Sequence, residues 1–340
     1  MSEKIRIAVD AMSGDLGPRV VITAAIRFVA TSPEVELLLV GDQDQIQSLL
    51  SSSSIPVSPA IRVHHATDVV AMHEDPLTAL RHKKNSSMWQ ALLQVQDGFA
   101  DACVSAGNTG ALMAMSKHLL KTFPGIDRPA ICKSMPVEQG NSFMLDLGAN
   151  LTCTPEQLHQ FALMGSVLAS SAGVEKPRVA LLNVGTEETK GTDLVKHSHV
   201  LLSQDEQLNY IGFIEGDELY LGRVNVIVCD GFSGNVALKS SEGVARLIAK
   251  KIEKSFARHW YLKLLVLFMR PVLRQWRREL NPGAYNGACF LGLQKPVVKS
   301  HGSADEDAFY QALVVAKEQV VQKVPARIQC ALNAMQKNQP

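Results

Sequence analysis

Five short turns rich in glycine and polar side chains recur along the chain, each after an apolar run. They are DAMSGD (10–15), SAGNTGA (105–111), DLGAN (146–150), NVGTEETKG (183–191) and DGFSGN (230–235). Glycine lets a ligand approach the backbone closely. Two of the turns lead into predicted helices, whose first N–H groups favour an anion such as phosphate. The residues predicted to bind substrate or phosphate here are Asp10, Gly14, Ser105, Gly107, Asn108, Thr109, Gly110, Asp146, Asn150, Gly185, Thr186 and Gly234.

Two side chains in these turns are candidates for catalysis. Lys190, in GTEETKG, carries an ammonium group that could stabilise a developing oxyanion, and Asn235 could donate its amide to the same oxygen. Each also has a plainer interpretation. Lys190 could pair on the surface with Glu187 or Glu188, and Asn235 could cap a helix. The residues alone leave both interpretations open.

Further basic and acidic side chains lie near the turns. In the run RHKKNSS, Arg81 could contribute to a phosphate clamp beside a helix start, or belong to a solvated charge run. His301 could act as a general acid or base, although a lone histidine is more often structural. Asp10, Asp15 and Asp146 could hold cationic side chains in place or bind a metal. Their spacing is not close, which favours the first role.

Several motifs of known chemistry are missing from the sequence. GTEETKG lacks the GK[ST] ending of a P-loop, and no GxGxxG follows the first predicted strand, which argues against ATP and nicotinamide sites. No GxSxG or Cys–His motif predicts an acyl-enzyme. The six scattered cysteines show no zinc-binding spacing. Any reaction is therefore expected to join two bound substrates directly. The N-terminus resembles no signal peptide, so a reducing cytoplasm is expected.

Apolar runs alternate with helical patterns through most of the chain. Strands are predicted at 4–10, 35–40, 61–65, 101–105, 142–146, 178–183 and 225–229, and helices at 18–30, 86–97 and 109–121. This alternation predicts an α/β fold with helices flanking a mostly parallel sheet. Ligands of such sheets bind beyond the carboxyl ends of the strands, where the five turns lie. We expect residues 1–340 to form one α/β domain, or two lobes of it around a cleft.

One basic segment contrasts with an acidic remainder. Residues 246–278 carry ten Lys or Arg and one acid, Glu253, whereas the rest of the chain carries 24 basic and 32 acidic side chains. This distribution indicates a local anionic partner and argues against a protein that coats nucleic acid. We expect residues 246–278 to form a basic amphipathic helical insertion that protrudes from the fold.

The stretch HWYLKLLVLFMRPVLRQWRR (259–278) is too short and too charged to cross a bilayer, which needs about 20 mostly apolar residues. A core or dimer-interface helix would explain its leucines. An amphipathic segment at a lipid interface would also explain its aromatic and basic residues. The residues predicted to dock on a membrane or a carrier are Trp260, Leu264, Leu267, Arg270, Arg274 and Arg277.

Taken in order, these motifs resemble the acyl-carrier-protein:phosphate acyltransferases of bacterial phospholipid synthesis, the PlsX family. The matching stretches are IAVDAMSGD, RHKKNSSM, SAGNTGALMA, DRPAI, MLDLGAN, LLNVGTEETKG, GFSGNVALKS and VVKSHGSA, which together span nearly the whole chain. One departure is Ser13, where the family's pattern has glycine, and it affects only the local backbone angles.

The resemblance implies transfer of a long-chain acyl group from acyl carrier protein to inorganic phosphate. The product, acyl phosphate, would serve a membrane glycerol-3-phosphate acyltransferase. The implied fold is that of isocitrate and isopropylmalate dehydrogenases and of phosphate acetyltransferase. A homodimer is implied, and no metal or organic cofactor. The resemblance strengthens Lys190 and Asn235 as catalytic residues, and Arg81 and His301 less so.

The implied reaction also bears on where the protein acts. An acyl phosphate is reactive, greasy and destined for a membrane enzyme, so we expect a cytoplasmic protein attached peripherally to an anionic membrane surface through roughly residues 255–278. Acyl carrier protein is acidic, so the same arginines could receive it.

Three alternatives stand beside this interpretation. The first is a short-chain phosphotransacylase that uses coenzyme A. The second is a non-catalytic scaffold that binds acyl carrier protein or a membrane. The third is a dehydrogenase of the related fold, which would need a nicotinamide site and usually a metal site, and the sequence offers neither.

Overall fold

The computed structural model describes residues 4–257 and 282–337. Within them, eleven strands form one sheet in the order β3-β2-β1-β4-β11-β10-β5-β6-β9-β7-β8. One parallel group comprises β1 (Ile5–Asp10), β2 (Val35–Gly41), β3 (Ile61–His65), β4 (Ala102–Ser105) and β11 (Val297–Lys299). The other comprises β6 (Asn141–Leu145), β9 (Val226–Val228), β7 (Arg178–Leu182) and β8 (Asn209–Ile214). Between them lie β10 (Ala288–Leu291) and β5 (Ala130–Pro136), which are antiparallel to each other and to their outer neighbours β11 and β6. The second parallel group therefore runs in the opposite direction to the first.

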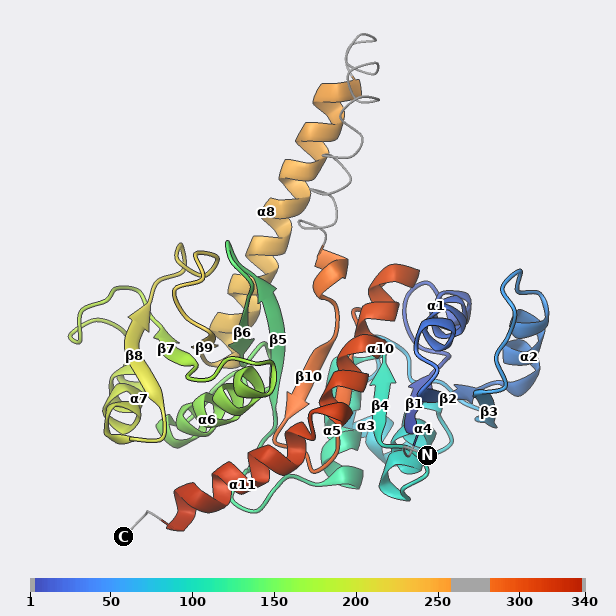
Figure 1. Cartoon of the computed structure of the whole chain (residues 1–340), viewed down its shortest axis with the longest axis horizontal. Helices are drawn as coiled ribbons and strands as arrows, with labels where there is room; N and C mark the ends of the chain where they lie inside the picture. Colours follow the sequence, from blue (N-terminus) through green and yellow to red (C-terminus); the bar gives the residue numbers. More distant parts are fainter. Residues whose placement is uncertain (1–3, 258–281, 338–340) are drawn as a thin grey trace.

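Helices flank the sheet, as Figure 1 shows. They are α1 (Pro18–Thr31), α2 (Gln43–Ser51), α3 (Pro76–His82), α4 (Ser87–Gln96), α5 (Thr109–Leu120), α6 (Pro155–Ser171), α7 (Asp193–Gln204), α8 (Gly231–Ala257), the short 3-10 helix η1 (Pro282–Tyr285), α10 (Glu306–Val321) and α11 (Val324–Lys337). Strand β1 shows why both faces of the sheet need cover. Ile7 and Val9 join one buried cluster with Phe309 of α10, whereas Ala8 joins a second cluster with Leu112 of α5. Alternate residues of a strand point to opposite faces, so both faces of β1 are apolar and covered.

The predicted fold class is confirmed, with strands at all seven expected places. Four strands were missed: β5, β8, β10 and β11. Two of them had weak sequence signals. In β5 the polar Lys133 and Ser134 interrupt the apolar run AICKSMP, and β11 has only three residues. The missed β10 and β5 are the antiparallel strands across which the strand direction changes between the two parallel groups.

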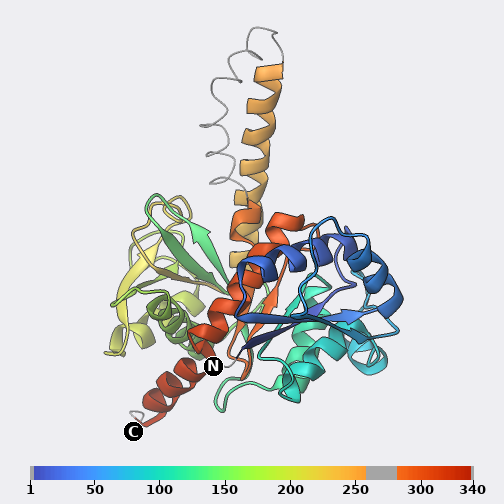
Figure 2. The ribbon, with the colours of Figure 1, turned by 45° about the vertical axis from the view of Figure 1, so that its right-hand side comes forward.

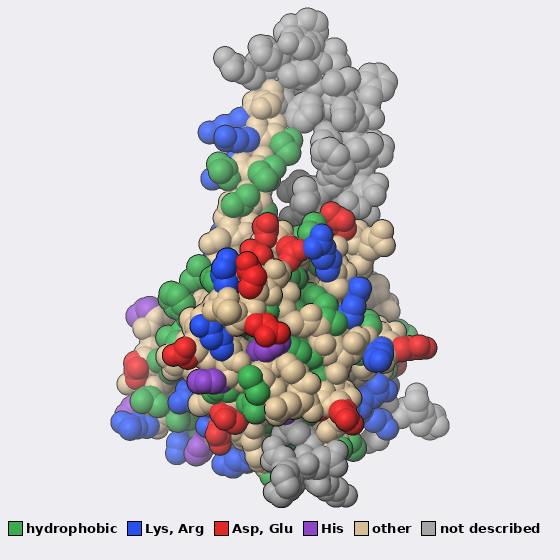
Figure 3. All heavy atoms as spheres, turned by 90° about the vertical axis from the view of Figure 1, so that its left-hand side faces the viewer, with side chains coloured by type: hydrophobic (Ala, Val, Ile, Leu, Met, Phe, Trp, Pro, Cys, Tyr) green, Lys and Arg blue, Asp and Glu red, His purple; other side chains and the backbone are tan. Residues whose placement is uncertain are grey.

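Helix α8 projects from the body of the molecule (Figures 1 and 2). Its 27 residues span roughly 40 Å at 1.5 Å per residue. The helix begins at Gly231, so residue 246 lies inside one continuous helix and does not begin an insertion. Hydrophobic and basic side chains both lie exposed along it (Figure 3). None of the helices in the described ranges combines the length and apolar character that a bilayer crossing requires. The predicted docking residues Trp260, Leu264, Leu267, Arg270, Arg274 and Arg277 lie outside the described residues.

Candidate active site

The first group of predicted site residues surrounds the ends of β1 and β4. Asp10 is fully buried and accepts a hydrogen bond from the Ser105 hydroxyl at 2.6 Å. Ser105 in turn lies 3.3 Å from the Ser13 hydroxyl and accepts from the Gly107 N–H at 3.1 Å. Burial raises the pKa of Asp10, while the bond from Ser105 opposes that rise. Asp10 therefore links the DAMSGD and SAGNTGA turns through a buried hydrogen bond, and its carboxylate is not exposed to a ligand.

The SAGNTGA turn leads into α5, and the side chain of Asn108 caps the N-terminus of that helix. The Asn108 side chain accepts from the Ala111 N–H at 3.0 Å and donates to the carbonyls of Met72 and Glu74 at 2.9 Å each. Thr109 follows at the exposed first turn of the helix. Gly110 is needed because a Cβ there would lie 2.6 Å from the ring of Pro76. Arg81 lies exposed in the last turn of α3, a helix that packs against α5.

A buried lysine that the sequence interpretation overlooked joins this first group. Lys299, at the end of β11, is 9% exposed and donates to the carbonyls of Ala106 and Ser300. Burial lowers its pKa to about 8, although Asp10 and Asp15 act in the opposite direction. The available signal was a lysine closing the short apolar run PVVK, within the matched stretch VVKSHGSA.

His301 lies just after this lysine, with charged groups from several elements near it. Its Nδ1 lies 2.9 Å from the Ser303 hydroxyl. The loss of part of its solvent shell lowers the pKa of His301; Glu242 of α8 opposes this, whereas Lys299 and Lys133 of β5 add to it. Gly14 lies beside this segment with φ 101°, and the Asp15 N–H donates to the Gly302 carbonyl at 2.7 Å. The DAMSGD and KSHGS turns are therefore held together.

The second group lies at the ends of β6, β9 and β7, which are parallel neighbours. Asp146 is fully buried, and its carboxylate accepts from the N–H groups of Ile131, Ala149 and Asn150. Burial raises the pKa of Asp146, and these backbone bonds oppose the rise. The Asn150 amide also donates to the Pro129 carbonyl at 2.9 Å. Asp146 and Asn150 therefore fix the shape of the DLGAN turn.

Helix α8 starts directly against this turn. A Cβ on Gly231 would lie 2.6 Å from the Asn150 carbonyl oxygen, and one on Gly234 would overlap the Asp146 carbonyl oxygen. Asp230 accepts from the Ser233 N–H at 2.9 Å and caps the helix. Asn235 therefore lies inside α8 and does not cap it. Its side chain is partly buried and faces Gly148, where a Cβ would be 3.5 Å from the Asn235 Cγ.

Lys190 lies in the turn after β7, whose end neighbours that of β9. Its ammonium is 3.4 Å from the Glu187 carboxylate, and both side chains are more than half exposed. Such exposed pairs contribute little, so the lysine is free to change partners. Gly185 packs against the Lys190 side chain, and Thr186 is exposed beside it. In this described region no hydrogen bond joins Lys190 to Asn235. The catalytic and binding roles of these residues stay predictions.

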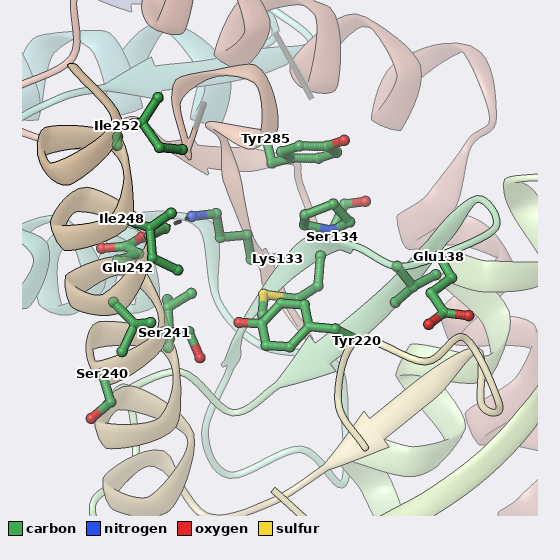
Figure 4. Close-up of a pocket in the computed structure, with 17 residues that line it drawn as sticks. Lys133, Ser134, Glu138, Tyr220, Ser240, Ser241, Glu242, Ile248, Ile252 and Tyr285 are labelled. Atoms are coloured by element: carbon green, nitrogen blue, oxygen red, sulfur yellow. Dashed lines mark hydrogen bonds and ion pairs between the residues drawn. The ribbon is translucent and has the colours of Figure 1, made fainter. Parts of the chain in front are cut away.

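A groove of about 870 Å³ lies between α8 and β5, and the sequence interpretation did not predict it. Figure 4 shows Lys133 reaching from β5 toward Glu242 of α8, at 3.2 Å, with Tyr220 and Tyr285 on the side facing the helix. Both charged side chains are about 15% exposed or less. The groove was missed because β5, one of its walls, was not predicted.

Comparisons with known proteins agree with this architecture. A family model described as "Fatty acid synthesis protein" matches residues 5–327. The chain is 58% identical over 333 residues to a phosphate acyltransferase of Cellvibrio japonicus (strain Ueda107), covering 96% of this chain and 98% of that protein. It is 51% identical over 337 residues to one from Saccharophagus degradans, covering 98% of each.

Solved structures show the same fold at low identity. A phosphotransacetylase from Streptococcus pyogenes matches with a TM-score of 0.65 and 17% identity over 95% of both chains. A 4-hydroxythreonine-4-phosphate dehydrogenase from Klebsiella pneumoniae matches with 0.52 and 12%, covering 93% of this chain and 99% of that one. The chain is thus an acyltransferase built on this α/β fold. It belongs to the phosphate acyltransferase family, and acyl transfer to phosphate is its chemistry.

Proposed function

We propose that the chain moves a long-chain acyl group from acyl carrier protein to inorganic phosphate, without an acyl-enzyme. The observation that supports this most is that three predicted turns follow the neighbouring parallel strands β6, β9 and β7. They place Asn235 against the DLGAN turn and Lys190 in the turn after the neighbouring strand.

In the proposed reaction, an oxygen of phosphate attacks the thioester carbonyl carbon. The new C–O bond forms as the carbonyl π electrons move to oxygen, and this oxyanion is stabilised by the Lys190 ammonium and the Asn235 amide. The C–S bond then breaks, the carbonyl reforms as acyl phosphate, and the carrier leaves as a thiolate that takes a proton from solvent. Phosphate is already a nucleophile, so holding it in line with the thioester is the main task.

His301 is not used as a base in this scheme, because it follows β11 in the first group, apart from Lys190 and Asn235. Partial burial lowers its pKa, which favours the neutral imidazole.

The partners proposed with this activity are acyl carrier protein, a second copy of the chain, and a membrane glycerol-3-phosphate acyltransferase that uses the product. Peripheral attachment to an anionic membrane surface, through roughly residues 255–278, would bring the product close to that enzyme. No nucleic acid is proposed as a partner.

The test is phosphate-dependent loss of the long-chain acyl-carrier-protein thioester, with formation of acyl phosphate. Folded protein that consumes none of it contradicts the proposal. Equal or faster turnover of a short-chain coenzyme A thioester would favour the phosphotransacylase alternative. Binding of acyl carrier protein without turnover would favour a scaffold.

Lys190→Ala tests the mechanism within this activity. It should reduce turnover by about 100-fold or more, as expected for removal of an oxyanion donor, without a change in circular dichroism. Lys176→Ala, an exposed lysine just before β7, is the matched control and should leave turnover unchanged. Near-normal turnover of Lys190→Ala would remove Lys190 from the mechanism.

A further inference from the structure

The groove beside α8 begins next to the second group of site residues on both of its walls. On one wall, Leu238 lies three residues beyond Asn235 in α8. On the other, Lys133 lies two residues beyond Ile131, whose N–H donates to Asp146 of the DLGAN turn. From there the groove follows α8 outward to Ile252, past Ala245, Ile248 and Ala249. Figure 4 shows Ser240, Glu242, Ile248 and Ile252 in succession along this wall.

Four of the eight polar side chains that line the groove are paired with one another. Lys133 bonds to Glu242 at 3.2 Å, and the Tyr220 hydroxyl bonds to Ser241. The remaining surface is chiefly apolar and comes from Met135, Val137, Leu238, Val244, Ala245, Ile248, Ala249 and Ile252. Val244 and Ile248 are 56% and 48% exposed, so the described residues leave them uncovered. Such a surface offers area to an apolar ligand and few free donors to a polar one.

We propose that this groove binds the hydrocarbon chain of the acyl substrate, with the thioester carbonyl at Asn235 and the chain directed outward along α8. The proposal rests on the acyl-transfer function proposed above and adds where the chain lies. It follows from the direction of the groove, which starts at the candidate reaction centre, and from its apolar lining. Each methylene buried there would raise affinity about fourfold. Catalytic efficiency should therefore rise with chain length until the groove is full.

Two bulky substitutions at different depths of the groove test how far the acyl chain extends along it. Ala245 lies ten residues beyond Asn235, roughly 15 Å along the helix axis, and Ala249 lies four residues further, roughly 21 Å from it. Ala245→Trp should lower kcat/KM for the palmitoyl carrier thioester at least tenfold while sparing the butyryl thioester. Ala249→Trp should spare the butyryl and intermediate chains and affect only longer ones. The measurement is kcat/KM across a series of acyl chain lengths.

Leu247→Trp is the matched control, because Leu247 is 54% exposed and about half a helical turn from Ala245. It should keep the wild-type chain-length profile. Retained butyryl turnover shows that each variant is folded. If both groove variants keep the wild-type dependence of kcat/KM on chain length, the acyl chain does not bind in the groove. The proposal also fails if Leu247→Trp loses as much kcat/KM for the palmitoyl thioester as Ala245→Trp. A dimer that dissociates on Ala245→Trp without a change of profile would also overturn it, in favour of a second copy as occupant. Absence of turnover by the wild type on every chain contradicts the acyl-transfer function itself.

Discussion

Gly234 is the glycine of α8 at which substitution by alanine should have the clearest effect, because α8 lies very close to the DLGAN turn there. A Cβ at this position would overlap the Asp146 carbonyl oxygen and lie 2.8 Å from Cys229 Sγ and 3.1 Å from the Asp146 carbonyl carbon. The nearest atom, the Asp146 carbonyl oxygen, belongs to the backbone and cannot rotate away, even if the Cys229 side chain does. Gly234→Ala must therefore push α8 away from the DLGAN turn, at a cost of about 1–3 kcal/mol in the free energy of unfolding. Asn235 moves with the helix, and a displacement of about 1 Å would lower turnover about 100-fold.

The same helix contains the control. A Cβ on Gly243 meets nothing within 4 Å, so Gly243→Ala should stabilise the protein by up to about 1 kcal/mol through helix propensity alone. Urea unfolding gives the free energies, and phosphate-dependent thioester consumption gives the turnover. A Gly234→Ala protein as stable and as active as the wild type would refute the close approach of α8 to Asp146. Equal losses in both variants would point to α8 being sensitive to any substitution.

Two further predictions concern pH and membrane binding. Lys299 has a pKa of about 8 in the folded protein and an ordinary value of 10.5, so the unfolded state binds more protons between these values. Between pH 8 and 10.5, the free energy of unfolding of the wild type relative to Lys299→Met should therefore rise by up to about 3 kcal/mol. The comparison is needed because burial also raises the pKa of thiols such as Cys103 and Cys229, which lowers the stability of both proteins over this range. A difference between the two proteins that stays constant in urea unfolding across this range would contradict the prediction. Leu264→Glu combined with Leu267→Glu should reduce co-sedimentation with anionic vesicles. Unchanged binding would assign these leucines to a core or an interface.

The sequence was sufficient for the elements with strong local signals. Strands such as β2 (VELLLVG) carry long apolar runs, and helices such as α1 begin at a proline after glycine. It failed where a strand is short or carries polar residues. Lys133 and Ser134 lie in β5 because they face the groove, where Glu242 pairs with the lysine. That tertiary partner is 109 residues away along the chain, so no local pattern could have indicated it.

The missed strands also limit what could be inferred about the site. In a wholly parallel sheet, all the turns after strands would lie at one edge. Here the strand direction changes across β10 and β5, so two turns can be inferred to lie close together only when their strands belong to the same parallel group. The turns after β6, β9 and β7 lie at neighbouring strand ends for this reason. Those after β1, β4 and β11 form a separate cluster around Asp10 and Lys299.

Burial distinguishes residues that shape the turns from those that can meet a ligand. In DLGAN, the N–H groups of Leu147, Ala149 and Asn150 already donate to Ile131 or Asp146, so this turn has few donors left for phosphate. In NVGTEETKG, the N–H groups of Gly185 and Thr186 have no hydrogen-bond partner among the described residues. The Lys190 ammonium lies in the same turn in an exposed pair, which an anion can replace at little cost. Of the turns near Asn235, NVGTEETKG is therefore the one we expect to hold phosphate, and DLGAN positions the helix that carries Asn235.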